Sequence, residues 1–322
     1  MPAFPDAPSI LFVHAAYQMK ARFDARGTGL HAIQVGSPDE LLARGVEADV
    51  ICVSGLWRNA VLENPGKLRF VQSISAGVDQ YDQAAFRAAN VRLASAQGVN
   101  ANAVSEHAMS LILAMARLLP MARDNQAKHF WRGMIGDIPQ REDELGGKTL
   151  LIVGLGRIGG RLARLAKAFD MKVIGVRRDP AGGMNGADSV HAMADLPALL
   201  PQADFVALTC PLTPETMGLM NAAAFAAMKP SARLINVARG KVVDEPAMIA
   251  ALTNGQIAGA ALDCVVEEPL PASSPLWELP NVFITPHSAG ETQRYEDSVI
   301  DILIENIGRL QRGETALKNQ IV

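Results

Sequence analysis

The sequence is poor in cysteine and in aromatic residues, and it lacks any long uninterrupted hydrophobic run. Its three cysteines, Cys52, Cys210 and Cys264, lie far apart in strand-like surroundings, so we expect buried, reduced thiols in a reducing compartment. The most apolar helical stretch, residues 108–116, is too short to span a bilayer. The N-terminal segment MPAFPDAP lacks the basic start and apolar run of a signal peptide. These absences favour a cytosolic protein.

Strong net charge is also absent. The formal net charge is -3, from 30 Lys and Arg against 33 Asp and Glu, which gives no electrostatic reason to expect nucleic acid or a membrane surface as a partner. We assign no set of metal ligands. A chain of 322 residues exceeds what one hydrophobic core usually supports, so two domains are expected.

Short apolar runs that alternate with helical patterns favour a parallel α/β protein. The expected strands lie within residues 9–15, 31–35, 49–54, 68–74, 91–96, 149–153, 172–176, 204–210, 232–238, 258–264 and 281–287. A long helix is expected from about Asn102 to Leu119, ended by Pro120, and a last helix from about Glu291 to Arg312. The packing stripe of the long helix is predicted to be Ala108, Leu111, Ile112, Met115 and Leu119.

A glycine-rich turn follows one of these strands. Gly154, Gly156 and Gly159 come directly after TLLIV and open a helical pattern, which is the context that a dinucleotide fingerprint requires. The glycines permit a tight turn and close approach of the backbone to a pyrophosphate, and the helix N-terminus supplies N–H groups. A turn that serves packing alone is the alternative, but the context favours dinucleotide binding.

The end of the next strand, KVIGVRRDP, bears on the choice of cofactor. An acid there would bind the adenosine ribose of NAD. Asp179 is one candidate, but it precedes Pro180 and has the character of a turn residue. Arg177 and Arg178 lie nearer the strand end, where paired guanidiniums would bind a 2′-phosphate. NADP is therefore favoured over NAD, while a purely solvated role for both arginines stays open.

Charged groups also follow three later strands, at the edge where open α/β sheets build their sites. Arg239 follows LINVA, Asp263 and Glu268 lie in AALDCVVEEPLP, and His287 lies in FITPHSAG. A buried arginine needs an anionic partner. For Arg239 that partner is either a structural carboxylate or a bound anion, and each of these residues alone is unremarkable.

The residues of the motifs and their order along the chain narrow the range of possible functions. From about Ser73 to Gly290 the chain carries SISAGVDQYD, GVNANAVSEHA, VGLGRIGG, CPLTPETMGLMN, LINVARGKVVDE, ALDCVVEEPLP and LWELPNVFITPHSAG. In this order they resemble the D-isomer-specific 2-hydroxyacid dehydrogenase family. The resemblance implies an NAD(P)-dependent oxidoreductase that interconverts a small 2-oxo acid and its D-2-hydroxy acid, with glyoxylate and hydroxypyruvate favoured as substrates.

The resemblance also implies an architecture. It is a Rossmann-type doubly wound sheet in residues 99–288, and a flavodoxin-like α/β substrate domain made of residues 1–98 and 289–322, with a cleft between them. A homodimer is implied as well, with residues 100–140 as the contact region.

Site residues follow from the same resemblance. Arg239 would clamp the substrate carboxylate and 2-oxo group, and Glu268 would pair with His287, which exchanges the proton. The substrate carboxylate would also be bound by backbone N–H groups of Ala76, Gly77 and Val78. Formate as substrate is disfavoured because Glu268 is present. The implied cofactor contacts are Gly154, Gly156, Arg157, Ile158, Gly159, Arg177, Arg178, Cys210, Pro211, Val237, Ala238, Asp263, His287, Ala289 and Gly290.

The chemistry of the residues agrees with these roles. Reduction of a 2-oxo acid needs a hydride on carbon and a proton on oxygen, and a histidine titrates near neutrality. The anionic partner of Arg239 would then be the substrate. A dinucleotide-sensing binding protein without turnover is the alternative, although a sensor need not retain Arg239, Glu268 and His287 together. Trp57 and Asn100 are each expected either to line the substrate pocket or to serve packing.

Overall fold

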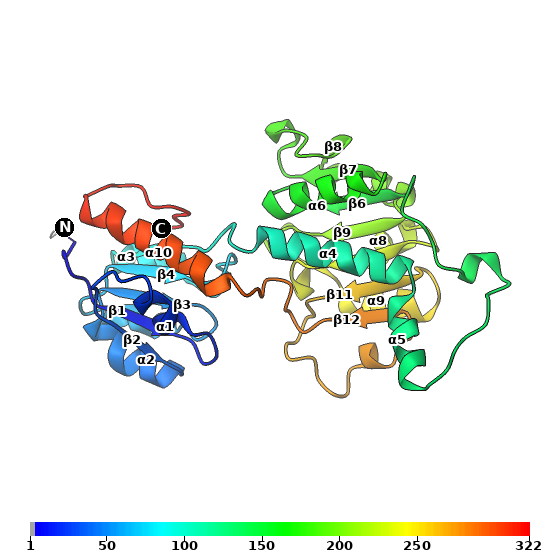
Figure 1. Cartoon of the computed structure of the whole chain (residues 1–322). Helices are drawn as coiled ribbons and strands as arrows, with labels where there is room; N and C mark the ends of the chain where they lie inside the picture. Colours follow the sequence, from blue (N-terminus) through cyan, green and yellow to red (C-terminus); the bar gives the residue numbers. More distant parts are fainter. Residues whose placement is uncertain (1–3) are drawn as a thin grey trace. The chain divides into compact units, whose positions relative to one another are not determined.

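The computed structural model describes residues 4–322. The chain forms two compact units: the first runs to Asn100 and resumes at Glu291–Val322, and the second is Ala101–Gly290 (Figure 1). Each unit is a parallel sheet with helices on both faces, which confirms the predicted α/β class with two different parallel sheets. No helix within residues 4–322 is long and apolar enough to cross a membrane.

The first unit is built on a five-stranded sheet in the order β2-β1-β3-β4-β5, the flavodoxin-like order. Its strands are β1 (Ile10–Val13), β2 (Ala32–Val35), β3 (Val50–Val53), β4 (Phe70–Ser73) and β5 (Arg92–Ala94). The helices are α1 (Met19–Asp24), α2 (Pro38–Arg44), α3 (Gln83–Ala88) and α10 (Tyr295–Gln311), with short turns η1 (Gly45–Glu47) and η2 (Asn59–Glu63). Three of these strands are buried at every residue, because helices cover both faces of the sheet.

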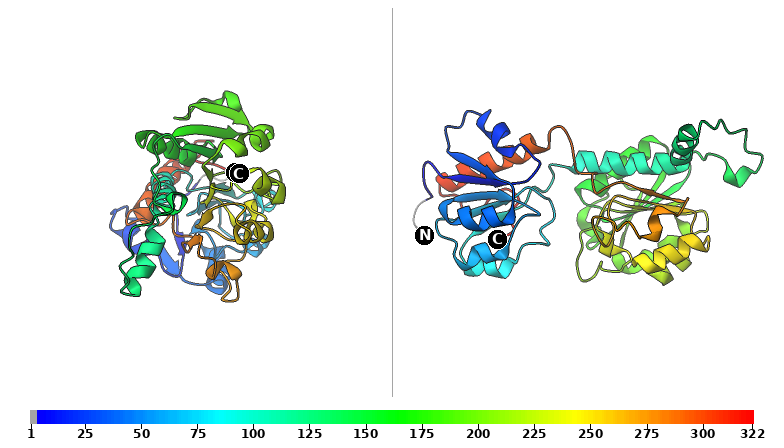
Figure 2. Two further views of the ribbon diagram at one scale, coloured as in Figure 1. Left: turned by 90° about the vertical axis from the view of Figure 1, so that its right-hand side faces the viewer. Right: turned by 90° about the horizontal axis from the view of Figure 1, so that it is seen from below.

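The final helix completes the first unit. Val299, Ile300 and Leu303 of α10 pack with Phe12 and Phe23 on the face that α1 also covers, while α2 and α3 cover the other face (Figure 2). The C-terminal segment of the chain therefore returns to the sheet built by the N-terminal one.

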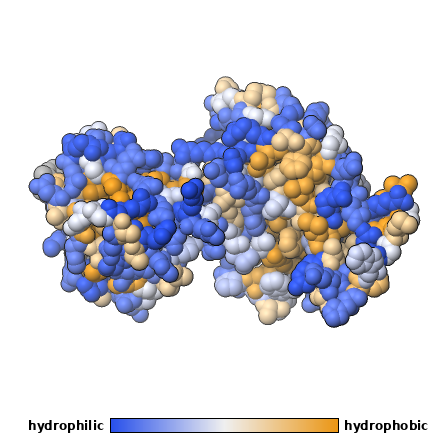
Figure 3. Space-filling view, in the orientation of Figure 1, coloured by the Kyte–Doolittle hydropathy of each residue, from blue (hydrophilic) through white to orange (hydrophobic). Residues whose placement is uncertain are grey.

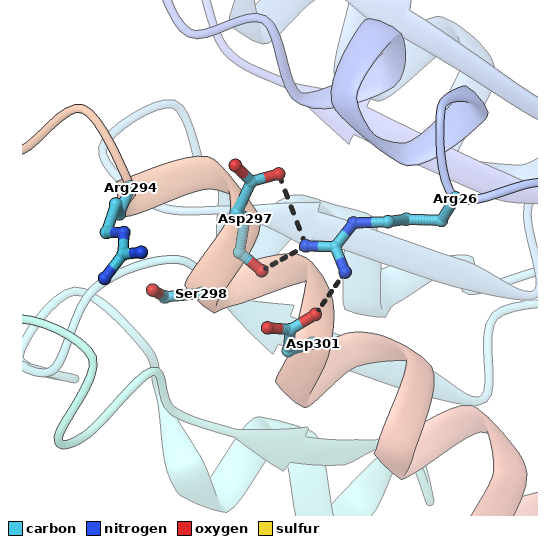
Figure 4. A pocket seen from close by; sticks show the side chains of 5 residues that line it. All are labelled: Arg26, Arg294, Asp297, Ser298 and Asp301. Carbon is cyan, nitrogen blue, oxygen red and sulfur yellow. Dashed lines mark hydrogen bonds and ion pairs between the residues drawn. The ribbon is translucent and has the colours of Figure 1, made fainter.

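A charged cluster fastens α10 to the segment of α1 (Figure 4). The guanidinium of Arg26 lies 2.7 Å from Asp301 and 3.3 Å from Asp297, and Arg22 also pairs with Asp297. These bonds lower the pKa of Asp297, first through Arg22 and then through Arg26. Since the cations and carboxylates neutralise one another at the surface, we assign this cluster a structural role of modest energy.

The second unit is built on a seven-stranded sheet in the order β12-β11-β10-β9-β6-β7-β8, a doubly wound Rossmann-type arrangement. Its strands are β6 (Thr149–Val153), β7 (Lys172–Arg177), β8 (Ser189–Ala192), β9 (Phe205–Leu208), β10 (Arg233–Asn236), β11 (Gly259–Leu262) and β12 (Val282–Ile284). The strand order reverses between β6 and β9, which is the switch point where such sheets bind ligands.

Helices cover both faces of this sheet (Figure 2). One face packs against α4 (Ala101–Ala116) and α6 (Arg157–Ala168), and the other against α7 (Leu196–Leu199), α8 (Ala222–Ala227) and α9 (Glu245–Thr253). The remaining elements are α5 (Leu119–Ala127) and the turns η3 (Ile138–Gln140), η4 (Pro180–Gly182), η5 (Met193–Asp195), η6 (Leu200–Gln202), η7 (Gly240–Val242) and η8 (Pro275–Trp277).

The prediction of one long helix ended by Pro120 was wrong. Helix α4 ends at Ala116, Leu118 takes a left-handed φ of 53°, and Pro120 lies in the first turn of α5. A proline is tolerated there because the first turn of a helix has no carbonyl partner for its N–H. Leu119 is accordingly 53% exposed instead of packed, whereas the other four residues of the predicted stripe are buried.

Candidate active site

The glycine loop lies at the switch point of the second sheet, between β6 and α6. Gly154 has a φ of 105°, and a Cβ there would come within 2.5 Å of the backbone nitrogen of Cys210. A Cβ on Gly159 would overlap the carbonyl oxygen of Gly154, while one on Gly156 would meet nothing within 4 Å. The loop is thus pressed against the strand ends and leaves open space at Gly156, directly before the twelve-residue helix that begins at Arg157. This arrangement fits a dinucleotide pyrophosphate.

At the end of β7 the acid and the arginines have different surroundings. Asp179 accepts a hydrogen bond of 3.0 Å from the N–H of Ala181 and so caps its own turn. Arg177, the last strand residue, donates to the carbonyl of Gly182 at 2.8 Å. Arg178 is exposed. The pKa of Glu215 is lowered, first by the Thr213 hydroxyl and to a lesser extent by the charge of Arg178. The exposed cation of this group is therefore Arg178.

Arg239 is positioned by the buried side chain of Asn236, at the end of β10. The Asn236 carboxamide accepts from the N–H of Ala238 at 3.0 Å and donates to the carbonyl of Arg239 at 3.2 Å. One Arg239 Nη donates to the carbonyl of Ala238 at 2.7 Å. A Cβ on Gly240 would overlap the carbonyl oxygen of Val265, so this loop lies directly against the segment that follows β11. Asn236 was not singled out in the sequence, although its fixed spacing from Arg239 was visible.

His287 and Glu268 form a hydrogen-bonded pair. His287 Nδ1 lies 2.7 Å from Glu268 Oε2, and the other carboxylate oxygen accepts from the N–H of Val265 at 3.1 Å. Both side chains are partly exposed, at 45% for the histidine and 37% for the glutamate. Because the carboxylate engages Nδ1, the Nε2 atom is the ring nitrogen left to exchange a proton with a bound molecule.

The loop that carries His287 wraps around a buried carboxylate. Asp263 is 2% exposed and accepts from the hydroxyl of Thr285 at 2.6 Å, from the N–H of Ser288 at 3.0 Å and from the N–H of Ala289 at 3.1 Å. His287 lies at the apex with a left-handed φ of 53°, which is uncommon for a residue with a side chain. Asp263 therefore fixes the backbone of His287, while Glu268 fixes its ring.

The other predicted contacts divide between the units. The second unit holds those that follow the carboxyl ends of its strands, namely Cys210 and Pro211 after β9, Val237 and Ala238 after β10, and Ala289 and Gly290 after β12. Ala76, Gly77 and Val78 belong to the first unit, where they follow β4 and are partly exposed.

Trp57 belongs to the core of the first unit and serves packing. It is 4% exposed, and its ring lies 5.2 Å from that of Phe86 and 5.7 Å from that of Tyr81. Its Nε1 donates to the Asn59 side chain at 2.8 Å. Asn100 is the last residue of the first unit and is partly buried.

Comparison with known proteins identifies the family of this chain. The family model of the "D-isomer specific 2-hydroxyacid dehydrogenase, NAD binding domain" matches residues 109–289, more than half of the 322-residue chain. The chain belongs to the D-isomer-specific 2-hydroxyacid dehydrogenase family.

Relatives in this family differ in length. The chain is 36% identical over 311 residues to a glyoxylate/hydroxypyruvate reductase B of Serratia proteamaculans, covering 93% of each chain. It is 37% identical to a D-3-phosphoglycerate dehydrogenase of Methanocaldococcus jannaschii over 86% of this chain and 52% of that one, so it spans about half the length of that relative. A solved NADPH-dependent glyoxylate/hydroxypyruvate reductase of Sinorhizobium meliloti, in complex with NADP and malonate, superposes with a TM-score of 0.83 at 27% identity, covering 98% and 97% of the two chains.

Proposed function

We propose that this family member is a reductase that interconverts a small 2-oxo acid and its D-2-hydroxy acid with a nicotinamide cofactor. Glyoxylate and hydroxypyruvate are the substrates we favour. The observation that carries the proposal is the 2.7 Å pair of His287 and Glu268, in the unit that also holds the glycine loop at its switch point. The likeness to the Serratia enzyme over nearly the whole chain supports the choice of substrate class.

The proton is the part of the reaction that the protein supplies. A nicotinamide cofactor, when bound, would supply the hydride for the 2-oxo carbon. His287 donates a proton from Nε2 to the oxygen of the same group, and the Glu268 carboxylate stabilises the imidazolium before donation. In the reverse direction the neutral imidazole accepts that proton. Glu268 also keeps the ring in one orientation and one tautomer.

The substrate carboxylate is bound in this proposal by the cation of Arg239 and by backbone N–H groups. Arg239 presents a planar fork that matches a carboxylate, and its charge also stabilises negative charge that grows on the oxygen. We propose that the backbone N–H groups of Ala76, Gly77 and Val78 bind the same carboxylate.

The proposal is tested by steady-state assays of NADPH and NADH oxidation with glyoxylate, hydroxypyruvate, pyruvate and phosphohydroxypyruvate. Turnover with the first two supports it. Tight cofactor binding without turnover of any 2-oxo acid would instead support a dinucleotide-sensing protein, and a strong preference for phosphohydroxypyruvate would overturn the choice of substrate.

For the cofactor we propose a preference for NADP. Asp179 is occupied as a turn cap, Arg178 is exposed beside it, and the Sinorhizobium relative is described with NADP. Replacement of Arg177 and Arg178 by glutamine is expected to shift the NADPH/NADH ratio of kcat/KM towards NADH by about tenfold or more, since even one charge-assisted hydrogen bond to the 2′-phosphate contributes about 1.5–3 kcal/mol.

The matched control for that double variant is Lys172→Gln, because Lys172 is an exposed cation at the other end of the same strand. The control should leave the cofactor ratio unchanged. A ratio equal to the wild-type value in the double variant would show that neither arginine contacts the 2′-phosphate.

We further propose a homodimer that uses the segment 119–138. Large apolar side chains are exposed along it: Leu119, Met121, Phe130, Trp131, Met134 and Ile138, with Trp131 at 96% and Met134 at 101%. Figure 3 shows hydrophobic residues on the segment that projects at the right-hand edge, which follows α5 in Figure 1, and on the adjoining face of the second unit. Exposed apolar surface of this kind favours association with a second, identical copy.

The dimer proposal predicts that Trp131→Asp with Met134→Asp converts the protein from dimer to monomer, because each substitution would bury a charge in the contact. Light scattering after gel filtration measures the mass directly. Met217→Asp, at a residue 60% exposed elsewhere in the second unit, is the control and should stay dimeric. A monomeric wild type would contradict the proposal.

We also propose a cytosolic location. All three cysteines are free and buried, as they are in proteins kept in a reducing compartment.

A further inference from the structure

A histidine outside the proposed catalytic set reaches the loop that carries His287. The Nε2 atom of His107, on α4, lies 3.0 Å from the hydroxyl of Thr285 and 3.5 Å from the carboxylate of Asp263. The same hydroxyl lies 2.6 Å from Asp263. A helix far away in the sequence thus meets the turn around the buried carboxylate.

The direction of these hydrogen bonds follows from the number of protons. A threonine hydroxyl has one proton, and the short contact with the Asp263 carboxylate takes it, since an ionised carboxylate only accepts. The hydroxyl must therefore accept from His107, whose proton lies on Nε2. The chain of donors runs from His107 to Thr285 to Asp263.

We propose that His107 is a positioning residue for His287 and acts through Thr285 and Asp263. Two hydrogen bonds hold Thr285 in place, and Thr285 and Asp263 together fix the turn whose apex is His287. The role rests on the proposed function, because it matters for turnover only if His287 exchanges the proton.

The left-handed conformation of His287 explains why this support is needed. A non-glycine residue with a φ of 53° lies in an unfavourable backbone region and is held there by its surroundings. Loss of the His107 donor removes one of the groups that fix the turn. A shift of about 1 Å in a reacting group is enough to lower a rate about a hundredfold.

The neighbouring residue on α4 has a separate contact and offers a control. Glu106 pairs with Arg161 of α6 at 2.7 Å, with both side chains partly exposed at 59% and 33%. It lies beside His107 in sequence but makes no hydrogen bond that is part of the chain to Asp263. Glu106→Gln removes a surface ion pair, which contributes little to stability.

The experiment compares His107→Leu and His107→Gln with Glu106→Gln in the full chain. A leucine fills the space without a donor, whereas the glutamine amide donates to Thr285. We expect His107→Leu to lower kcat by about ten- to a hundredfold with little change in KM for the cofactor, and His107→Gln to recover most of the loss. Equal losses in both variants, or none in His107→Leu, would overturn the proposal.

Thr285→Val gives an independent variant of nearly the same shape. It should show the same defect as His107→Leu, and the double variant should be no worse than either single one, because both remove the same chain of hydrogen bonds. A loss of kcat in the double variant equal to the two single losses combined would overturn the proposal.

A second measurement does not depend on turnover. In the cofactor-free protein labelled with ¹⁵N-histidine, the ring signals of His287 should shift or broaden in His107→Leu and Thr285→Val and stay unchanged in Glu106→Gln. Unchanged His287 signals in both former variants would overturn the positioning role. A wild type without activity on any 2-oxo acid would overturn the proposed function alone, since the shifted signals would still report the coupling.

Discussion

Replacement of His287 by alanine is expected to lower kcat about a hundred- to ten-thousandfold, while the dissociation constant for the cofactor stays nearly unchanged. General acid–base catalysis by a positioned side chain contributes a factor of about this size. His287 is the proposed proton donor, its ring fixed by Glu268 at 2.7 Å, whereas the proposed pyrophosphate site is the glycine loop. Stopped-flow turnover and cofactor fluorescence titration measure the two quantities separately.

Two further variants serve as a comparison and a control for His287→Ala. Glu268→Gln keeps a hydrogen-bond acceptor for Nδ1 but removes the charge that stabilises the imidazolium, so a smaller loss of kcat is expected. His31→Ala removes an exposed histidine of the first unit and should have no effect. Equal losses of turnover and of cofactor affinity in His287→Ala would contradict the acid–base role.

Arg239→Lys should lower kcat/KM for the 2-oxo acid by about a hundredfold, although the positive charge is retained. Lysine is a point charge on a flexible stem and cannot form two parallel hydrogen bonds to a carboxylate. In Arg239 the guanidinium is also oriented by its bond to the carbonyl of Ala238. Misorientation of the substrate by about 1 Å is sufficient for a loss of this size.

The measurement is the substrate dependence of turnover at saturating cofactor. Arg164→Lys, on the exposed side of α6, is the conservative control and should behave as the wild type. Efficiency near the wild-type value in Arg239→Lys would remove the bidentate clamp from the mechanism.

The strands were predictable wherever they are buried on both faces. The runs around β1, β3, β9 and β10 are apolar and short, and the predicted segments contain the observed ones. The edge strand β8 was not predicted, because its four residues are only partly buried and show no apolar run. The end of the long helix was predicted at Pro120 instead of Ala116, since a proline in a first turn and one that ends a helix look alike in the sequence.

The sequence by itself predicted the α/β class, and the resemblance of its motifs implied the family and the proposed site residues Arg239, Glu268 and His287. Glycines, charges and strand ends are local features, so their spacing along the chain carries this information.

Tertiary structure alone decided the rest. It placed Trp57 in the core and brought His107 of α4 within 3.0 Å of Thr285. The physical reason is that such contacts join side chains that are distant in sequence, and they exist only after the helices pack on the sheet. No periodicity along the chain encodes which distant hydroxyl the partly buried imidazole of His107 will meet.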